Sequence, residues 1–201
     1  MEAVQNGIAT VARKSKAGEL IEWVAQARSF DDTRYFMTGV HVEPHGEVAG
    51  HNVIVATDGR RLHYATIPED ILEPGEYLYS VTKTDIVLTR PSDGSDWPDW
   101  HRVIPETTQK TSYIAQTWSK GDGHGASTYA CELVRDTGAN LNFQYLFDLG
   151  WKKQSIDYAV GMCADSHADS SPYEWTGRPQ SKALSFDAKD RHAVIMPMTR
   201  D

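Results

Sequence analysis

Apolar and polar residues alternate with a period of two along several short segments of the chain's first half, a pattern that predicts strands. Residues 15–29 instead place apolar side chains such as Leu20 and Val24 at helical spacing, and Ser15 is positioned to cap the helix N-terminus. The predicted strands cover residues 7–11, 34–43, 52–57 and 61–66. The first half therefore has the element order β-α-β-β-β.

The second half repeats this pattern with longer connections. Residues 142–153 carry apolar side chains, including Phe143 and Leu146, at helical spacing, and Asn142 is a candidate N-cap. The further predicted strands cover residues 77–81, 85–90, 113–118, 128–135, 155–163, 183–187 and 192–198. No internal sequence repeat accompanies this order, so the duplication is one of architecture.

This organisation predicts an α+β fold of two β-α-β-β-β modules, whose two helices cover one face of a curved antiparallel sheet. We expect one domain over residues 1–201, a length sufficient for a buried core. Module one spans about residues 5–95, a linker-like segment spans 96–105, and module two spans about 106–201.

The composition is that of a globular protein. Apolar residues make up 40% and charged residues 24% of the chain, and no apolar run approaches the roughly 20 residues that a membrane-spanning helix needs. The N-terminus lacks the features of a secretory signal, and Cys131 and Cys163 show no disulfide or zinc-site spacing. We therefore expect a cytoplasmic protein. A net charge of −8 argues against simple coating of nucleic acid, but leaves a local basic surface open.

The sequence contains no P-loop, nucleophile elbow or dinucleotide fingerprint. His41, Glu43 and His45 alternate along one predicted strand and would face the same side, as metal ligands do. Three ligands without a fourth favour an ordinary strand face. Trp97 and Trp100 allow base stacking, although tryptophans that flank a proline more often pack at a domain junction. We expect no enzyme activity, no cofactor and no metal.

Four segments occur in the order in which a known family has similar ones. They are Val55-Ala56-Thr57-Asp58-Gly59-Arg60-Arg61-Leu62, residues 97–105, residues 141–146, and Val194-Ile195-Met196-Pro197-Met198. Together they resemble the bacterial sliding DNA clamp, the beta subunit of the replicative polymerase. The resemblance implies a DNA-clamp-like fold, with helices lining a DNA hole and sheets forming the outer wall.

The chain departs from that family in size. The family's chains hold three domains and dimerise into a six-domain ring, whereas this chain has modules for one domain. A compacted, phage-type clamp fits this departure, and such a chain would close a ring of family size only as a homohexamer, through heterologous interfaces.

The resemblance also implies a hydrophobic groove for short partner peptides. Its expected residues are Thr57, Gly59, Arg60, Arg61, Leu62, Pro98, Arg102, Val103, Val194, Ile195, Met196, Pro197 and Met198. Apolar side chains, methionines and rigid prolines suit such a groove. Two alternatives stay open: Thr57-Asp58-Gly59 is also an ordinary turn, and 194–198 is also a plausible core strand.

DNA-facing residues are expected beside the two helices. They are Lys14, Lys16, Arg28, Lys152 and Lys153, which would meet phosphates without reading sequence. Glu19 and Glu22 share the first helix, so a solvated amphipathic face explains the same pattern.

The sequence thus predicts a processivity factor for DNA replication that tethers a DNA polymerase to double-stranded DNA. The expected partners are DNA, polymerase and clamp-loader peptides, and further copies of the chain in a homo-oligomeric ring. The alternative is a monomeric interaction module that binds replication-protein peptides without encircling DNA. A metal-dependent enzyme that uses His41 and His45 is the third, outlying hypothesis.

Overall fold

The computed structural model describes residues 7–92, 97–105, 109–115, 141–150, 156–162, 183–188 and 190–198. The chain divides into two compact units, Met1–Asp99 and Trp100–Asp201, and each is described by itself. The boundary falls inside the linker-like segment predicted at 96–105. Both units combine helices with antiparallel strands, so the predicted α+β fold is confirmed.

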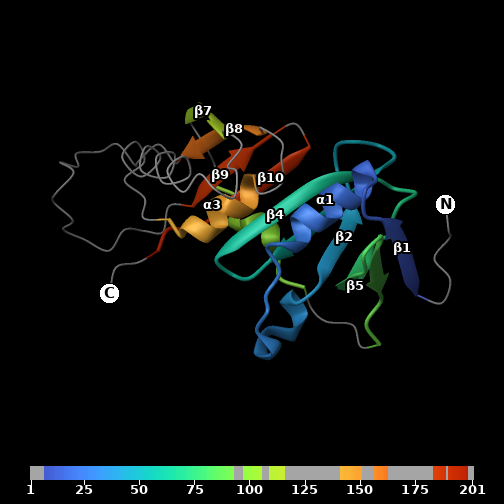
Figure 1. Cartoon of the computed structure of the whole chain (residues 1–201). Coiled ribbons are helices and arrows are strands. Elements are labelled where there is room, and N and C mark those ends of the chain that lie inside the picture. Colours follow the sequence, from blue (N-terminus) through green and yellow to red (C-terminus); the bar gives the residue numbers. More distant parts are fainter. Residues whose placement is uncertain are drawn as a thin grey trace, which may run out of the picture. The chain divides into compact units, whose positions relative to one another are not determined.

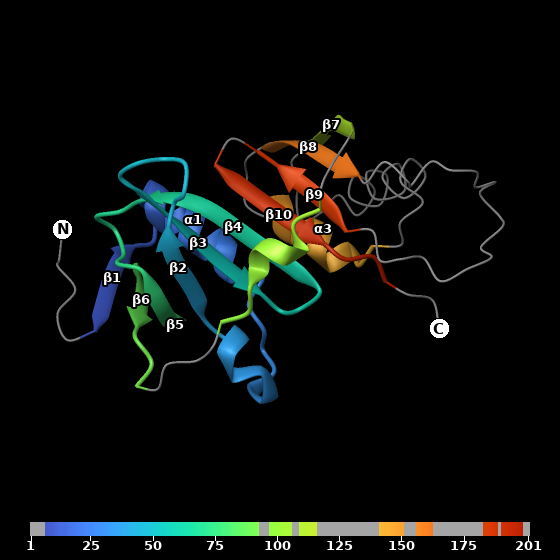
Figure 2. The ribbon, with the colours of Figure 1, turned by 180° about the vertical axis from the view of Figure 1, so that it is seen from behind.

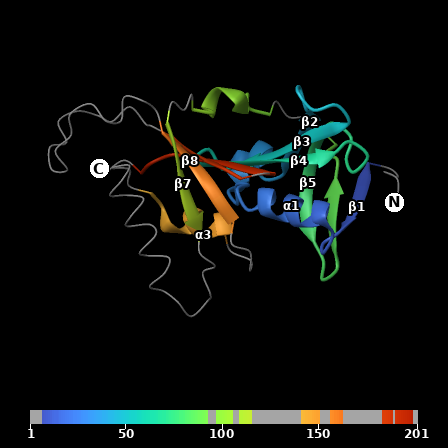
Figure 3. The same ribbon diagram turned by 90° about the horizontal axis from the view of Figure 1, so that it is seen from above.

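The first unit is a six-stranded antiparallel sheet with one α-helix on one face (Figures 1 and 3). The strand order is β1-β6-β5-β2-β3-β4. Along the chain its elements are β1 (Ile8–Ala12), α1 (Lys16–Ala25), the 3-10 segment η1 (Asp32–Met37), β2 (Val40–Pro44), β3 (His51–Thr57), β4 (Arg61–Pro68), β5 (Gly75–Val81) and β6 (Asp85–Thr89). The hairpin predicted from residues 77–81 and 85–90 is confirmed as β5–β6.

The second unit follows the order β-α-β-β-β among its described strands and α-helix. Its elements are the 3-10 segment η2 (Trp100–Val103), β7 (Gln109–Ala115), α3 (Phe143–Gly150), β8 (Ile156–Met162), β9 (Leu184–Asp187) and β10 (Arg191–Ile195). The strands pair antiparallel in the order β10-β9-β8-β7, and Figure 2 shows β9 and β10 in front of α3.

The sequence folds α1 onto the sheet through its cap and its apolar face. The hydroxyl of Ser15 accepts a hydrogen bond from the Gly18 amide (3.0 Å) and donates one to the Ala12 carbonyl (2.7 Å). The cap thereby joins the end of β1 to the start of the helix. Ile21 and Val24 are completely buried, and α1 packs against β3 and β4.

The strand predicted over residues 34–43 was wrong at its N-terminal end, because side-chain chemistry closes a 3-10 turn there. The carboxylate of Asp31 accepts hydrogen bonds from the amide (3.0 Å) and hydroxyl (2.7 Å) of Thr33. The Arg34 amide donates to the Asp31 carbonyl (2.9 Å). Aspartate and threonine commonly compete with regular backbone pairing in this way, so the strand begins only at Val40.

Two further boundaries were set too far along the chain. The helix predicted over 15–29 ends at Ala25. The next amide, of Gln26, donates a hydrogen bond to the carbonyl of Trp23, three residues earlier (3.3 Å). The strand predicted over 192–198 ends at Ile195, because Pro197 has no amide hydrogen to donate to a ladder. The strand predicted over 128–135 and the end of the predicted second helix, 151–153, lie outside the described residues.

None of the helices in the described part of the chain is long and apolar enough to cross a membrane.

The contact between α1 and β1 generates a stability prediction. A Cβ added to Gly18 would lie 2.2 Å from the Ala12 carbonyl oxygen, so Gly18→Ala must displace backbone. We expect a loss of about 2 kcal/mol in the free energy of unfolding, despite the better helix propensity of alanine. Urea denaturation measures it. Gly46→Ala is the matched control, since nothing lies within 4 Å of its added Cβ. Equal stability of the two variants would contradict the close approach.

Candidate functional site

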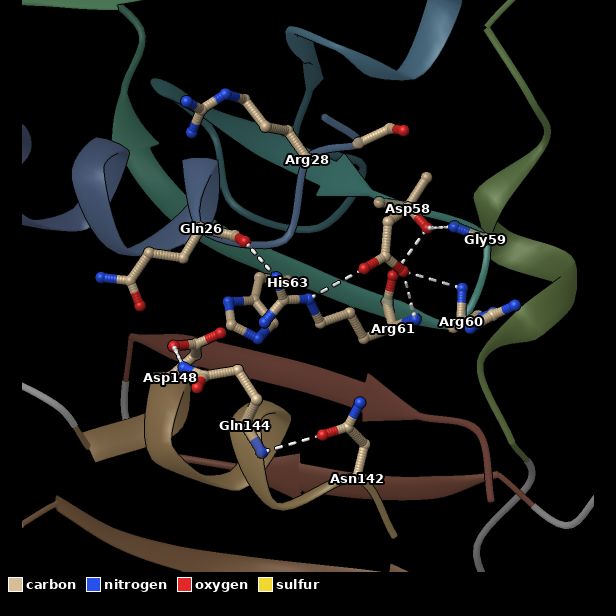
Figure 4. A network of polar contacts seen from close by, with 12 residues as sticks. Gln26, Arg28, Asp58, Gly59, Arg60, Arg61, His63, Asn142, Gln144 and Asp148 are labelled. Carbon is tan, nitrogen blue, oxygen red and sulfur yellow. Dashed lines mark hydrogen bonds and ion pairs between the residues drawn. The ribbon is translucent and has the colours of Figure 1, made fainter. Parts of the chain in front are cut away.

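The turn between β3 and β4 is closed by the side chains of its own residues (Figure 4). The Thr57 hydroxyl donates to the Arg61 carbonyl (2.7 Å) and accepts from the Gly59 amide (3.0 Å). One carboxylate oxygen of Asp58 accepts from the amides of Arg60 (2.9 Å) and Arg61 (3.0 Å). Gly59 has a φ of 84°, a conformation that favours glycine. The sequence of the turn is therefore explained by its local geometry.

Arg61 connects this turn to the end of α1. Its side chain is 6% exposed, and Nε donates to the second carboxylate oxygen of Asp58 (3.1 Å). Nη2 donates to the Gln26 carbonyl, just beyond the helix (2.5 Å). Arg34 of η1 adds a hydrogen bond to the Asp58 carbonyl (2.8 Å). The Arg61 guanidinium is thus held inside the first unit, whereas Arg60 is exposed.

Next to this network lies a buried histidine that the sequence analysis did not single out. The His63 ring stacks on Trp23 with ring centroids 4.4 Å apart, and its Nδ1 lies 3.1 Å from the Trp23 carbonyl oxygen. Complete burial lowers the pKa of His63 to about 3, so the ring is neutral at neutral pH. Nδ1 then carries the hydrogen and donates it, because a carbonyl oxygen can only accept. No sequence pattern marks this histidine, since its partner lies 40 positions away.

The predicted groove residues divide between the two units and differ in exposure. In the first unit, Leu62 is a 2% exposed core residue and Pro98 is half-buried. In the second, Val194 and Ile195 are core residues of β10, as the core-strand alternative expected. The groove residues that are exposed to solvent are Gly59, Arg60, Arg102, Val103 and Met198, while Met196 and Pro197 are half-buried and Thr57 is buried. The large apolar side chains among these exposed residues are Val103 and Met198, which are 45% and 43% exposed.

The predicted DNA-facing residues also fall into different classes. Lys14 and Lys16 are exposed at the start of α1. Arg28 is half-buried: its guanidinium donates to the Ala25 carbonyl (2.7 Å) and lies over the rings of Phe30 (4.5 Å) and Tyr79 (4.8 Å). Burial lowers the pKa of Arg28 from its usual range. Lys152 and Lys153 lie outside the described residues.

Arg13 is a further cation beside α1, and it is bound to Glu22 from that helix. Two hydrogen bonds of 2.6 and 2.8 Å join the guanidinium to both carboxylate oxygens. This bidentate geometry holds the two groups together more firmly than a single surface contact does.

The three candidate metal ligands on β2 and beyond do not form a site. His41 lies 3.6 Å from the Glu43 carboxylate and stacks on Trp97, with ring centroids 5.5 Å apart. Burial lowers the pKa of His41. His45 accepts hydrogen bonds from the amides of Glu47 (3.1 Å) and Val48 (3.2 Å), within its own turn. Among the described residues no group of three or more histidine, cysteine, aspartate or glutamate side chains is arranged to hold a metal ion.

The tryptophans at the boundary of the units pack within the protein. Trp97 stacks on His41, and Trp100 stacks on His101 with ring centroids 4.0 Å apart. Trp100 is only 5% exposed, so base stacking is excluded for it in this conformation. Both tryptophans therefore pack against protein side chains, which is the more common role of tryptophans that flank a proline.

Solved structures of bacterial sliding clamps share this fold over the full length of the chain. DNA polymerase III beta of Caulobacter crescentus aligns with a TM-score of 0.58 at 15% identity, over 69% of its own length. The sliding clamp of Pseudomonas aeruginosa aligns with a TM-score of 0.56 at 16% identity, over 68% of its own length. The beta subunit of Borrelia burgdorferi aligns with a TM-score of 0.59 at 11% identity, over 67% of its own length. No protein-family model and no curated protein matches the sequence. The predicted likeness to sliding clamps is therefore confirmed at the level of the fold.

The buried His63 generates a prediction of how stability depends on pH. The pKa of His63 is about 3 in the folded chain and about 6.5 in the unfolded chain, so the unfolded state binds more protons between these values. Stability therefore falls as pH falls from about 6.5 towards 3, by up to about 1.4 kcal/mol per pH unit from this group alone. Urea denaturation between pH 4.5 and 7 measures the slope.

His63→Phe keeps an aromatic ring against Trp23 but removes the titrating group, so its slope should be shallower than that of the unmodified chain. The lowered pKa of His41 acts in the same direction in both proteins and cancels in the difference. Parallel slopes in the two proteins would rule out His63 as the source.

Proposed function

We propose that this chain is a non-enzymatic, sliding-clamp-like processivity factor that tethers a DNA polymerase to double-stranded DNA. The observation that carries the proposal is the likeness in fold to bacterial sliding clamps over the whole chain. A tether of this kind acts without chemistry: it raises the effective concentration of the polymerase at its template.

Assembly into a homo-oligomeric ring is part of the proposal. β1 is an end strand of the first unit's sheet, and β7 is an end strand of the second unit's sheet. End strands present unpaired backbone groups that readily pair with another chain. Pairing β1 of one copy with β7 of the next would be a heterologous contact, and such contacts give a ring when their rotation closes.

Contact with DNA would be non-specific and electrostatic. Lys14, just before the N-cap of α1, and Lys16, in its first turn, are exposed and would meet phosphates through charge. The net charge of −8 would then be carried mainly by surfaces away from the DNA.

The second candidate function is a monomeric module that binds replication-protein peptides without encircling DNA. The observation that favours it is the engagement of a cation beside α1: both carboxylate oxygens of Glu22 accept hydrogen bonds from Arg13. Oligomeric state separates the two candidates, since light scattering finds an oligomer for a ring and a monomer for the module.

Peptide binding tests the tethering half of the proposal. Val103 and Met198 are the exposed large apolar residues of the proposed groove. Val103→Glu and Met198→Glu should each weaken binding of a fluorescein-labelled clamp-binding peptide with leucine and phenylalanine anchors by at least about tenfold, because an apolar anchor would face a charge. Fluorescence anisotropy measures the affinity.

Val48→Glu is the matched control, an exposed valine (42%) on the turn between β2 and β3. It should bind the peptide as the unmodified chain does. Each variant must keep its thermal unfolding transition. Unchanged affinity in folded Val103→Glu and Met198→Glu would remove these residues from the proposed groove.

A further inference from the structure

Phe30 is the most exposed of the large apolar side chains in the described part of the chain, at 74%. It follows α1 along the chain, and Arg28 lies against its ring. The Arg28 guanidinium is 4.5 Å from the centre of the Phe30 ring and 4.8 Å from that of Tyr79. We call these three residues the aromatic–arginine cluster. Figure 4 shows the Arg28 side chain directed away from Asp58 and Arg61.

The cation in this cluster is fixed but not neutralised by a carboxylate. Among the described residues, the guanidinium donates one hydrogen bond, to the Ala25 carbonyl (2.7 Å), and forms no ion pair with an acidic side chain. The nearby Glu22 is bound to Arg13, and an oxygen of Asp31 is held by Thr33. A guanidinium has five N–H donors in a rigid plane, so most of them are left for an anion.

The cluster thus presents two recognition elements side by side. Phe30 exposes a ring on which a flat aromatic group can stack, and Arg28 offers planar donors that suit a phosphate. A nucleotide carries both groups, a base and a phosphate, at neighbouring positions. In a duplex the bases are stacked inside the helix, so only a single strand can present a base to an exposed ring.

We propose that the aromatic–arginine cluster binds single-stranded DNA, with a base stacked on Phe30 and a phosphate at Arg28. The choice of DNA rests on the proposed function, whereas the nucleotide chemistry rests on the cluster itself. The half-buried Tyr79, on β5, fixes the position of the guanidinium because its ring packs against Arg28. The site would bind unpaired template DNA, in addition to the non-specific binding of duplex DNA.

The test uses the full chain and a labelled twenty-nucleotide oligothymidylate at low salt, with a blunt duplex of the same length as the second probe. Phe30→Ala and Phe30→Leu should each weaken oligothymidylate binding about tenfold, because both remove the stacking ring. Phe30→Trp should retain it. None of the three should change duplex binding more than about twofold, since duplex binding depends on phosphate charge.

Val48→Ala is the matched control for loss of an exposed apolar side chain, and it should leave both affinities unchanged. Arg28→Lys keeps the charge but loses the planar donors, and should weaken oligothymidylate binding more than duplex binding. Phe30 is mostly exposed, so its variants should unfold at the temperature of the unmodified chain, which circular dichroism checks.

Three results would overturn the inference: no measurable binding of oligothymidylate by the unmodified chain, unchanged affinity in Phe30→Ala and Phe30→Leu, or equal losses for both probes. Failure of the proposed function has a different signature. A chain that binds oligothymidylate through Phe30 but does not assemble or hold duplex DNA would retain this site and lose the clamp.

Discussion

The first unit depends on the ion pair and hydrogen bonds of one buried cation, the Arg61 guanidinium. It lies inside the protein, pairs with the Asp58 carboxylate and donates to the Gln26 carbonyl. A buried charge is stable only when its donors are satisfied, and here the acceptors come from a strand turn and from a helix end. The β3–β4 turn and the end of α1 are therefore held in one geometry, to which Arg34 ties the 3-10 segment η1.

This interaction changes how the resemblance to sliding clamps is interpreted. The segment 55–62 is one of the four that together carry the resemblance, and five of its residues, Thr57 and Arg61 among them, were expected in a binding groove. Thr57 and Arg61 are buried and form hydrogen bonds within the unit. Their pattern follows from folding requirements, so the motif indicates the fold more directly than it indicates a partner. The exposed positions, Val103 and Met198 among them, carry the proposal of peptide binding.

Much of the fold could be predicted from the sequence, because local signals determine it. Ser15 marks the start of α1, and an Asp-Gly turn separates β3 from β4. The errors arose where tertiary or side-chain interactions replaced regular pairing, as in the turn that Asp31 closes with Thr33. The His63–Trp23 stack and the aromatic–arginine cluster were missed as sites, because their partners are far apart in sequence. Arg28 was singled out only as a DNA-facing cation, which stays a prediction, and its contact with Tyr79 depends on β5 lying near the end of α1.

Encirclement of DNA is the central claim of the functional proposal, and topological retention measures it most directly. The chain would be incubated with a linear duplex whose two ends are then blocked by bulky protein, and washed at high salt to screen phosphate contacts. A chain that encircles DNA stays on the blocked duplex and is released when the duplex is cut between the blocks. Equal loss from blocked and open-ended duplexes in the high-salt wash would contradict encirclement.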